Sequence, residues 1–237
     1  DASGTGIGTI DSAGSFNNDA GFSIVSYTGN SPTATTIKHG LNSIPQMIIF
    51  KRLVGVGNMT AYHQSLGNTK AIFLTTTAAS DTSAGYFNNT TPTSSVFSVA
   101  NSGDTNSNGN AMIAYCFAEK QGYSKFGSYT GNGNADGNFI YTGFKPAMVI
   151  LKGASGSGST ENWSMYDNKR TGFNVDNNVL YPNANSAEGT SDDIDLLSNG
   201  FKIRRQTGLL NDAQNYIYMA FAENPFVTST GVPATAR

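Results

Sequence analysis

The chain has 237 residues, of which only 13% are charged, and its formal net charge is −2. The 14 Lys and Arg residues are scattered along the chain, and nucleic-acid binding usually needs a basic stripe, so we expect no nucleic-acid partner. No apolar run approaches the ~20 residues of a membrane-spanning helix, and a single cysteine, Cys116, excludes an intrachain disulfide.

The first 20 residues are rich in Gly, Ser, Asn and Asp and carry few apolar anchors. We predict that residues 1–20 form an N-terminal arm or linker. The start, Asp1-Ala2-Ser3-Gly4, does not resemble a signal peptide and favours an internal start within a longer protein. The last residues, 227–237, are small and polar and are predicted to be a tail.

Short apolar, aromatic and β-branched runs recur between these ends, at residues 22–27, 47–50, 72–74, 96–99, 148–151, 201–203 and 216–221. Such runs favour β-strands. Clusters of Gly, Asn and Asp separate them at intervals of roughly 8–15 residues, which is typical of a sandwich or barrel. No stretch shows the apolar spacing of an amphipathic helix. The pattern therefore predicts an all-β protein.

Several blocks occur twice, in the same order and roughly 100 residues apart, which is the signature of a repeat. Residues 27–30 and 129–132 both read Tyr-Thr-Gly-Asn, and Phe-Ala-Glu occurs at 117–119 and 221–223. The other matched blocks are 45–51 with 146–152, 58–62 with 162–166, and 96–99 with 200–203. We predict two tandem homologous β-sandwich (jelly-roll-like) modules from an internal duplication, at residues 21–122 and 123–226.

Little in the chain points to nucleophilic catalysis. Cys116 lies opposite Ala220 of the second copy, so we interpret it as a buried core thiol. His39 and His63 are matched by Thr142 and Asp167, and no spacing around them predicts a triad. The glycine-rich segments lack the Lys-Ser/Thr pair and helix of a phosphate-binding loop. We therefore expect no enzyme activity.

Asp192, Asp193 and Asp195 form the main acidic cluster, with Glu188 just before it. On a strand, Asp193 and Asp195 would share a face. The first interpretation is a solvent-facing strand guarded by charge. A second is a calcium site, since hard cations take clustered carboxylates, although the spaced Asp loop of an EF-hand is absent. A third is the carboxylate pair of a glycan hydrolase.

The single tryptophan, Trp163, is the centre of a second candidate site. Aromatic rings stack on the apolar faces of sugars, while amides and carboxylates bind the hydroxyl groups. Asn162, Trp163, Tyr166 and Asp167 are therefore the predicted glycan contacts. The alternative is that Trp163 anchors the core, as a lone tryptophan does in many sandwiches. The first copy has Met59 and His63 instead, so one copy alone would bind.

The second copy also carries a family resemblance, in residues 123–133, 142–147, 162–167, 197–203 and 220–223. These blocks resemble a repeat found in structural and tail-fibre-like proteins of marine phages, cyanophages among them. The resemblance covers about residues 21–226. The family has no assigned activity, so the resemblance implies a virion-associated role without catalytic residues.

We therefore expect a non-enzymatic structural protein of a phage virion: a tail-fibre, head-fibre or decoration module that contributes to attachment to the host surface. Its expected partners are other virion proteins and further copies of itself. A carbohydrate-binding adhesin that recognises a host surface polysaccharide is the alternative, and a polysaccharide depolymerase is a more distant one. No cofactor besides calcium is expected, and no insertion into a membrane.

Overall fold

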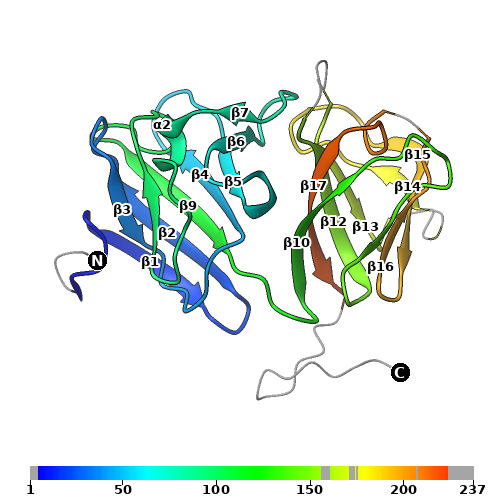
Figure 1. Cartoon of the computed structure of the whole chain (residues 1–237), viewed down its shortest axis with the longest axis horizontal. Coiled ribbons are helices and arrows are strands. Elements are labelled where there is room, and N and C mark those ends of the chain that lie inside the picture. Colours follow the sequence, from blue (N-terminus) through cyan, green and yellow to red (C-terminus); the bar gives the residue numbers. More distant parts are fainter. Residues whose placement is uncertain (1–4, 156–160, 171–173, 175, 207, 224–237) are drawn as a thin grey trace. The chain divides into compact units, whose positions relative to one another are not determined.

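The structure is a computed structural model that describes residues 5–155, 161–170, 174, 176–206 and 208–223. It is all-β, with 43% of the described residues in strands and 4% in helices, which confirms the predicted class (Figure 1). The described chain forms two compact units: residues up to 74 with 80–119, and residues 75–79 with those from 120 onward. The predicted tail at 227–237 lies outside the described residues.

The main sheet of unit 1 has the strand order β1-β2-β9-β4-β5-β6-β7. These strands are β1 (Ser12–Asn17), β2 (Phe22–Thr28), β9 (Ala111–Phe117), β4 (Met47–Arg52), β5 (Thr60–His63), β6 (Lys70–Phe73) and β7 (Asp81–Thr82). A second pair, β3 (Thr35–Lys38) and β8 (Val96–Val99), forms its own small sheet. Two short helical turns, η1 (Gln64–Leu66) and α2 (Ala84–Phe87), complete the unit.

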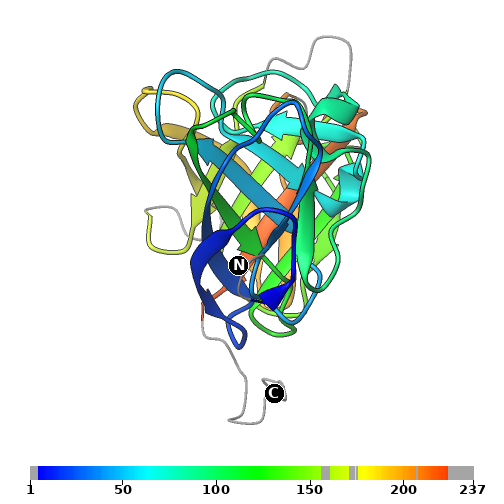
Figure 2. The ribbon, with the colours of Figure 1, turned by 90° about the vertical axis from the view of Figure 1, so that its left-hand side faces the viewer.

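Strand β1 lies within the segment predicted to be an arm. It pairs antiparallel with β2 along its whole length, from Ser12 opposite Tyr27 to Asn17 opposite Phe22, and is drawn in dark blue in Figure 2. The arm prediction is therefore corrected for residues 12–17. Five of its six residues are exposed, so the strand has no apolar alternation by which the sequence would reveal it.

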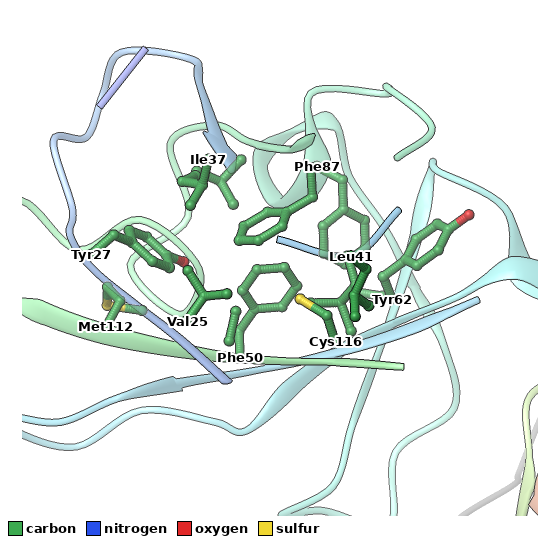
Figure 3. Close-up of a cluster of buried hydrophobic side chains, with 14 of the residues drawn as sticks. Val25, Tyr27, Ile37, Leu41, Phe50, Tyr62, Phe87, Met112 and Cys116 are labelled. Carbon is green, nitrogen blue, oxygen red and sulfur yellow. The ribbon is translucent and has the colours of Figure 1, made fainter. Parts of the chain in front are cut away.

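The core of unit 1 contains side chains from both of its sheets. Phe50 of β4 contacts Phe97 of β8 edge-on, with ring centroids 5.4 Å apart. Phe50 also contacts Phe87 of α2, with centroids 5.8 Å apart, and Figure 3 shows these two rings. Cys116 lies fully buried in this core, and burial raises the pKa of its thiol to about 12. Since the thiolate is the reactive form, this agrees with the predicted core thiol.

Unit 2 contains two four-stranded sheets. One has the order β10-β17-β12-β13, from β10 (Ser124–Thr130), β17 (Asn215–Ala222), β12 (Pro146–Gly153) and β13 (Ser164–Asp167). The other has the order β11-β16-β15-β14, from β11 (Phe139–Tyr141), β16 (Gly200–Ile203), β15 (Gly189–Leu197) and β14 (Asp176–Val179). Val149 and Tyr218 of the first sheet share one core cluster with Ile194 and Phe201 of the second.

The strand pairings of unit 2 repeat those of unit 1. The order β10-β17-β12-β13 corresponds to β2-β9-β4-β5, and the pair β11-β16 corresponds to β3-β8. The registers agree as well: Tyr27 faces Met112 as Tyr129 faces Tyr216, Ile37 faces Phe97 as Ile140 faces Phe201, and Met47 faces His63 as Met148 faces Asp167. Blocks matched in the sequence thus occupy equivalent positions in the two units.

Candidate functional site

The predicted glycan contacts lie at and just before strand β13. Trp163 is only 2% exposed and Tyr166 is fully buried, so neither presents a ring face to a sugar. The burial of Tyr166 follows from strand alternation, which turns Ser164 and Tyr166 inward and leaves Met165 and Asp167 partly exposed. Trp163 precedes the strand and is buried too, as the alternative interpretation expects, but it lies outside the core cluster of unit 2. The geometry therefore does not favour stacking of a saccharide on these two rings.

The two polar members of that set are bound to neighbouring side chains. Asn162 accepts a hydrogen bond from Asn183 at 2.9 Å, and the Asn183 side chain accepts the backbone N–H of Trp163 at 2.8 Å. Asp167 forms an ion pair with Arg170, 2.8 Å from Nε to Oδ2. These contacts lie just before β13 and at its last residue. Asn162 and Asp167 therefore hold the two ends of the strand in position.

Asp193 is the centre of a buried polar group in unit 2. It is 1% exposed, accepts a hydrogen bond from the Tyr166 hydroxyl at 2.7 Å, and forms an ion pair with Arg205 Nη1, also at 2.7 Å. Burial, and then the Asp193 carboxylate, raise the pKa of Tyr166 well above its ordinary value. A buried carboxylate needs such partners to offset its lost hydration. Asp193 thus joins β15 to β13.

The acidic cluster does not form a shared cation site in the described residues. Asp195 is paired with Arg204, 3.5 Å from Oδ2 to Nε, whereas Asp193 binds Arg205. The pairing of β14 with β15 shifts register between Asp176 and Asn178, and an inserted residue of this kind re-aims side chains. Asp193 and Asp195 accordingly have different partners, contrary to the shared face that we expected.

Of the rest of the cluster, the structure describes the side chain of Glu188 alone. The Asp192 side chain lies outside the part of the structure that is described, and Glu188 binds Arg170 and Asn178. Among the described residues, no three His, Cys, Asp or Glu side chains are grouped so that they could hold a metal ion. The carboxylates of Asp193 and Asp195 are each paired with a different arginine.

Both histidines are buried within unit 1. His39 Nδ1 accepts the backbone N–H of Leu41 at 3.1 Å, and Nε2 lies 3.1 Å from the carbonyl oxygen of Thr93. A ring that accepts at Nδ1 and donates at Nε2 is neutral, and burial lowers the pKa of His39. His63 accepts the N–H of Ser65 and caps η1. Both imidazole rings therefore stabilise the backbone turn that follows them, through the N–H groups of Leu41 and Ser65.

A buried lysine in unit 2 was not anticipated from the sequence. Lys152, at the end of β12, has no exposed surface, and its Nζ donates to the carbonyl oxygen of Glu161 at 2.8 Å. Burial lowers the pKa of Lys152 to about 8 and raises the pKa of the Glu161 carboxyl. A shifted lysine is a candidate for chemistry, but the backbone acceptor gives this ammonium a structural role.

The Tyr-Thr-Gly-Asn blocks are each closed by a buried asparagine that sequence reasoning missed. Asn106 Oδ1 accepts the backbone N–H of Asn30 at 2.8 Å, while its Nδ2 donates to the side chain of Asn30 at 3.2 Å. In unit 2, Asn211 makes the same two bonds to Asn132, at 2.9 and 3.0 Å. We refer to Asn106 with Asn30, and Asn211 with Asn132, as the asparagine clamps.

The neighbours of each clamp are equivalent too. Tyr27 donates its hydroxyl hydrogen to the carbonyl oxygen of Thr105, and Tyr129 donates to that of Leu210. Asn106 also donates to the backbone of Ala100, as Asn211 does to that of Arg205. The segment from Asn106 to Met112 is one residue longer than that from Asn211 to Tyr216, which hides the match in the sequence.

The structure describes no helix that is long and apolar enough to cross a membrane. A family model described as a domain of unknown function, DUF7483, matches residues 1–225. The chain therefore belongs to the DUF7483 family, and one family domain spans both units. No curated protein and no solved structure matches the chain. The description of the family assigns no activity, so it gives no particular residue a role.

Proposed function

We propose that the two units are copies of one β-sandwich (jelly-roll-like) module that arose by internal duplication. The shared strand order and registers support this, and so do the two asparagine clamps. Each clamp occurs together with the glycine and the tyrosine of its Tyr-Thr-Gly-Asn block. Its occurrence at equivalent positions of both units is the observation that favours common descent over two unrelated β folds.

We propose further that the chain is a non-enzymatic structural component of a phage virion, in a tail fibre, head fibre or decoration, where it contributes to attachment to the host surface. The observation that carries this is the repeated clamp. In both units its buried asparagines hold two loops together, which favours a rigid structural module. Repeated modules in series suit an extended scaffold. The resemblance to tail-fibre-like repeats of marine phages supports the virion as its location.

The mass of the chain in solution and its action on polysaccharides test this proposal together. We expect light scattering to give a multiple of the 24.9 kDa chain mass, since a scaffold assembles with copies of itself. We also expect no reducing ends from host-surface polysaccharides. Reducing ends released by the wild-type chain, and lost in Asp193→Asn with Asp195→Asn, would favour the depolymerase instead.

A carbohydrate-binding adhesin is the second candidate function. One observation favours it: a pair of exposed aromatic side chains on strand β11, Phe139 and Tyr141. The adhesin and the scaffold are compatible, because a fibre module that meets the host surface requires a binding face. The scaffold is the primary proposal because its support extends over both units, whereas the aromatic pair lies in unit 2 alone.

A further inference from the structure

Strand β11 displays two aromatic rings on the outer side of unit 2. Tyr141 is 64% exposed and Phe139 is 47% exposed, while Ile140 between them is buried in the core. Alternation along the strand therefore places both rings on the same outer face. Among the described strands, β11 pairs with β16 alone and ends its sheet. Two neighbouring aromatic rings are thus exposed together at a sheet edge.

The residues of β16 opposite the rings determine how the rings pack. Gly200 of β16 lies directly opposite Tyr141, and Lys202 lies opposite Phe139. A Cβ at Gly200 would lie 3.1 Å from Cε2 of Phe139, so the phenyl ring lies close to the glycine backbone. Any larger residue at Gly200 would meet this ring and the Ile140 carbonyl oxygen. The absence of a side chain at Gly200, which is buried, therefore lets the Phe139 ring pack against the β16 backbone.

Charged groups border the rings. Lys202 forms an ion pair with Asp136, and the register places Asp195 of β15 opposite Lys202. Asp195 in turn pairs with Arg204. All of these groups are partly exposed. They supply donors and acceptors fixed in place beside an apolar surface.

We propose that this aromatic face, formed by Phe139, Tyr141, Gly200, Lys202 and Asp136, binds a saccharide. The proposal rests on the attachment role given above and names its site. A sugar ring has an apolar C–H face, which packs on an aromatic ring, and hydroxyl groups at its rim, which take hydrogen bonds from charged side chains. The aromatic face has a partner for each part of the sugar. The rings of Phe139 and Tyr141 would pack on the C–H face, and the charged side chains beside them would bind the hydroxyl groups.

Size favours a sugar over a second protein. A stable protein interface buries about 800 Å² on each partner, whereas one aromatic side chain supplies about 150–250 Å² when fully buried. Two partly exposed rings fall short of the first figure and match a ligand of one or two sugar units. Unit 1 carries Thr36 and Lys38 at the equivalent positions, beside Ile37, so the proposal assigns the site to unit 2 alone.

The experiment is a glycan array of algal, plant and bacterial polysaccharides probed with the full chain, followed by titration calorimetry on the strongest hit. Tyr141→Ala and Phe139→Ala are expected to weaken binding by about tenfold or more, since each removes one stacking ring. Phe16→Ala is the matched control, because Phe16 is 53% exposed on edge strand β1 of unit 1. Circular dichroism must show that all three variants fold.

A blank array for a folded wild-type sample would overturn the proposal. Binding that survives both β11 substitutions, or falls equally in Phe16→Ala, would overturn it too. So would self-association that disappears in Tyr141→Ala, because it would assign the face to a second copy of the chain. A blank array combined with a multimeric mass would leave the scaffold role standing, so the two proposals fail separately.

Discussion

Asn30 and Asn106 hold each other through a reciprocal pair of hydrogen bonds. The side-chain Oδ1 of Asn106 accepts the Asn30 backbone N–H at 2.8 Å, and the side-chain Nδ2 of Asn106 donates to Oδ1 of Asn30 at 3.2 Å. The two residues lie far apart in the sequence, so this bond pair closes the loop after β2 against the loop before β9. Asn132 and Asn211 do the same in unit 2.

Asn106→Ala and Asn211→Ala should each lower the free energy of unfolding by about 3 kcal/mol. Each substitution leaves several buried backbone groups without a partner, and each such group costs about 1–3 kcal/mol. Urea denaturation measures the effect. Asn108→Ala is the control, because Asn108 is exposed in the same loop and its loss should change stability by less than about 0.5 kcal/mol. Equal losses of stability in Asn106→Ala and Asn108→Ala would show that the clamp does not stabilise the fold.

Gly29→Ala and Gly131→Ala should be equally disruptive for a steric reason. A Cβ at Gly29 would lie 2.2 Å from the carbonyl oxygen of Ser107, and one at Gly131 would lie 2.1 Å from that of Asp212. Backbone must move in both cases, which we expect to cost about 2 kcal/mol or more. Thermal unfolding provides the comparison. Gly103→Ala should be mild, because the contact at Gly103 is to a flexible arginine at 3.8 Å.

Tyr166→Phe should destabilise unit 2 by about 1.5–3 kcal/mol, the range for a hydrogen bond to a charged group. It removes the hydroxyl that donates to the buried Asp193 carboxylate at 2.7 Å. Chemical denaturation would detect the change. Tyr141→Phe removes an exposed hydroxyl and should leave stability unchanged. If Tyr166→Phe were as stable as the wild type, the hydroxyl would add nothing to the link between β13 and β15.

His39 should make unit 1 sensitive to mild acid. Burial lowers the pKa of His39 in the folded state, so between the unfolded value near 6.5 and the lowered folded value the unfolded chain binds more protons. The contribution of His39 is therefore complete above about pH 6.5 and is lost as the pH falls towards the folded value. The loss is about 1.4 kcal/mol for each unit by which the pKa is lowered.

His39→Asn isolates this effect, because its side-chain oxygen can accept the Leu41 N–H without titrating. The free energy of unfolding is compared at pH 7.5 and 5.0 in the wild type and the variant. We expect a smaller loss in the variant. An identical loss in both proteins would mean that other groups cause the acid sensitivity.

Local pattern was sufficient to predict the all-β class, because alternating and continuous apolar runs reflect burial directly. The run at residues 47–50 lies within β4, and residues 216–221 lie within β17. Strand β1 escaped prediction because Ser12, Ala13, Gly14 and Ser15 carry no apolar alternation. Backbone hydrogen bonds to β2 hold the strand in place, and such bonds leave no pattern of side chains in the sequence.

The candidate sites were harder to predict because they depend on tertiary orientation. Trp163 has the chemistry of a sugar contact, but its burial depends on how the chain enters β13. Asp193 and Asp195 were expected to share a face, and a register shift in the pairing of β15 gives them different partners. The aromatic face combines β11 and Asp136 just before it with β16, which is distant in the sequence, so no single motif marks it.

The most direct measurement of the proposed function is electron microscopy of phage particles labelled with a gold-conjugated antibody against the purified chain. Under the proposal the chain is encoded by a phage, and the particles are prepared from that phage. The account predicts label at fixed positions on intact virions, on fibres or on the capsid surface, and its loss when the antibody is pre-absorbed with the chain. Unlabelled particles, with the chain detected only in the host-cell lysate, would contradict a structural role in the virion.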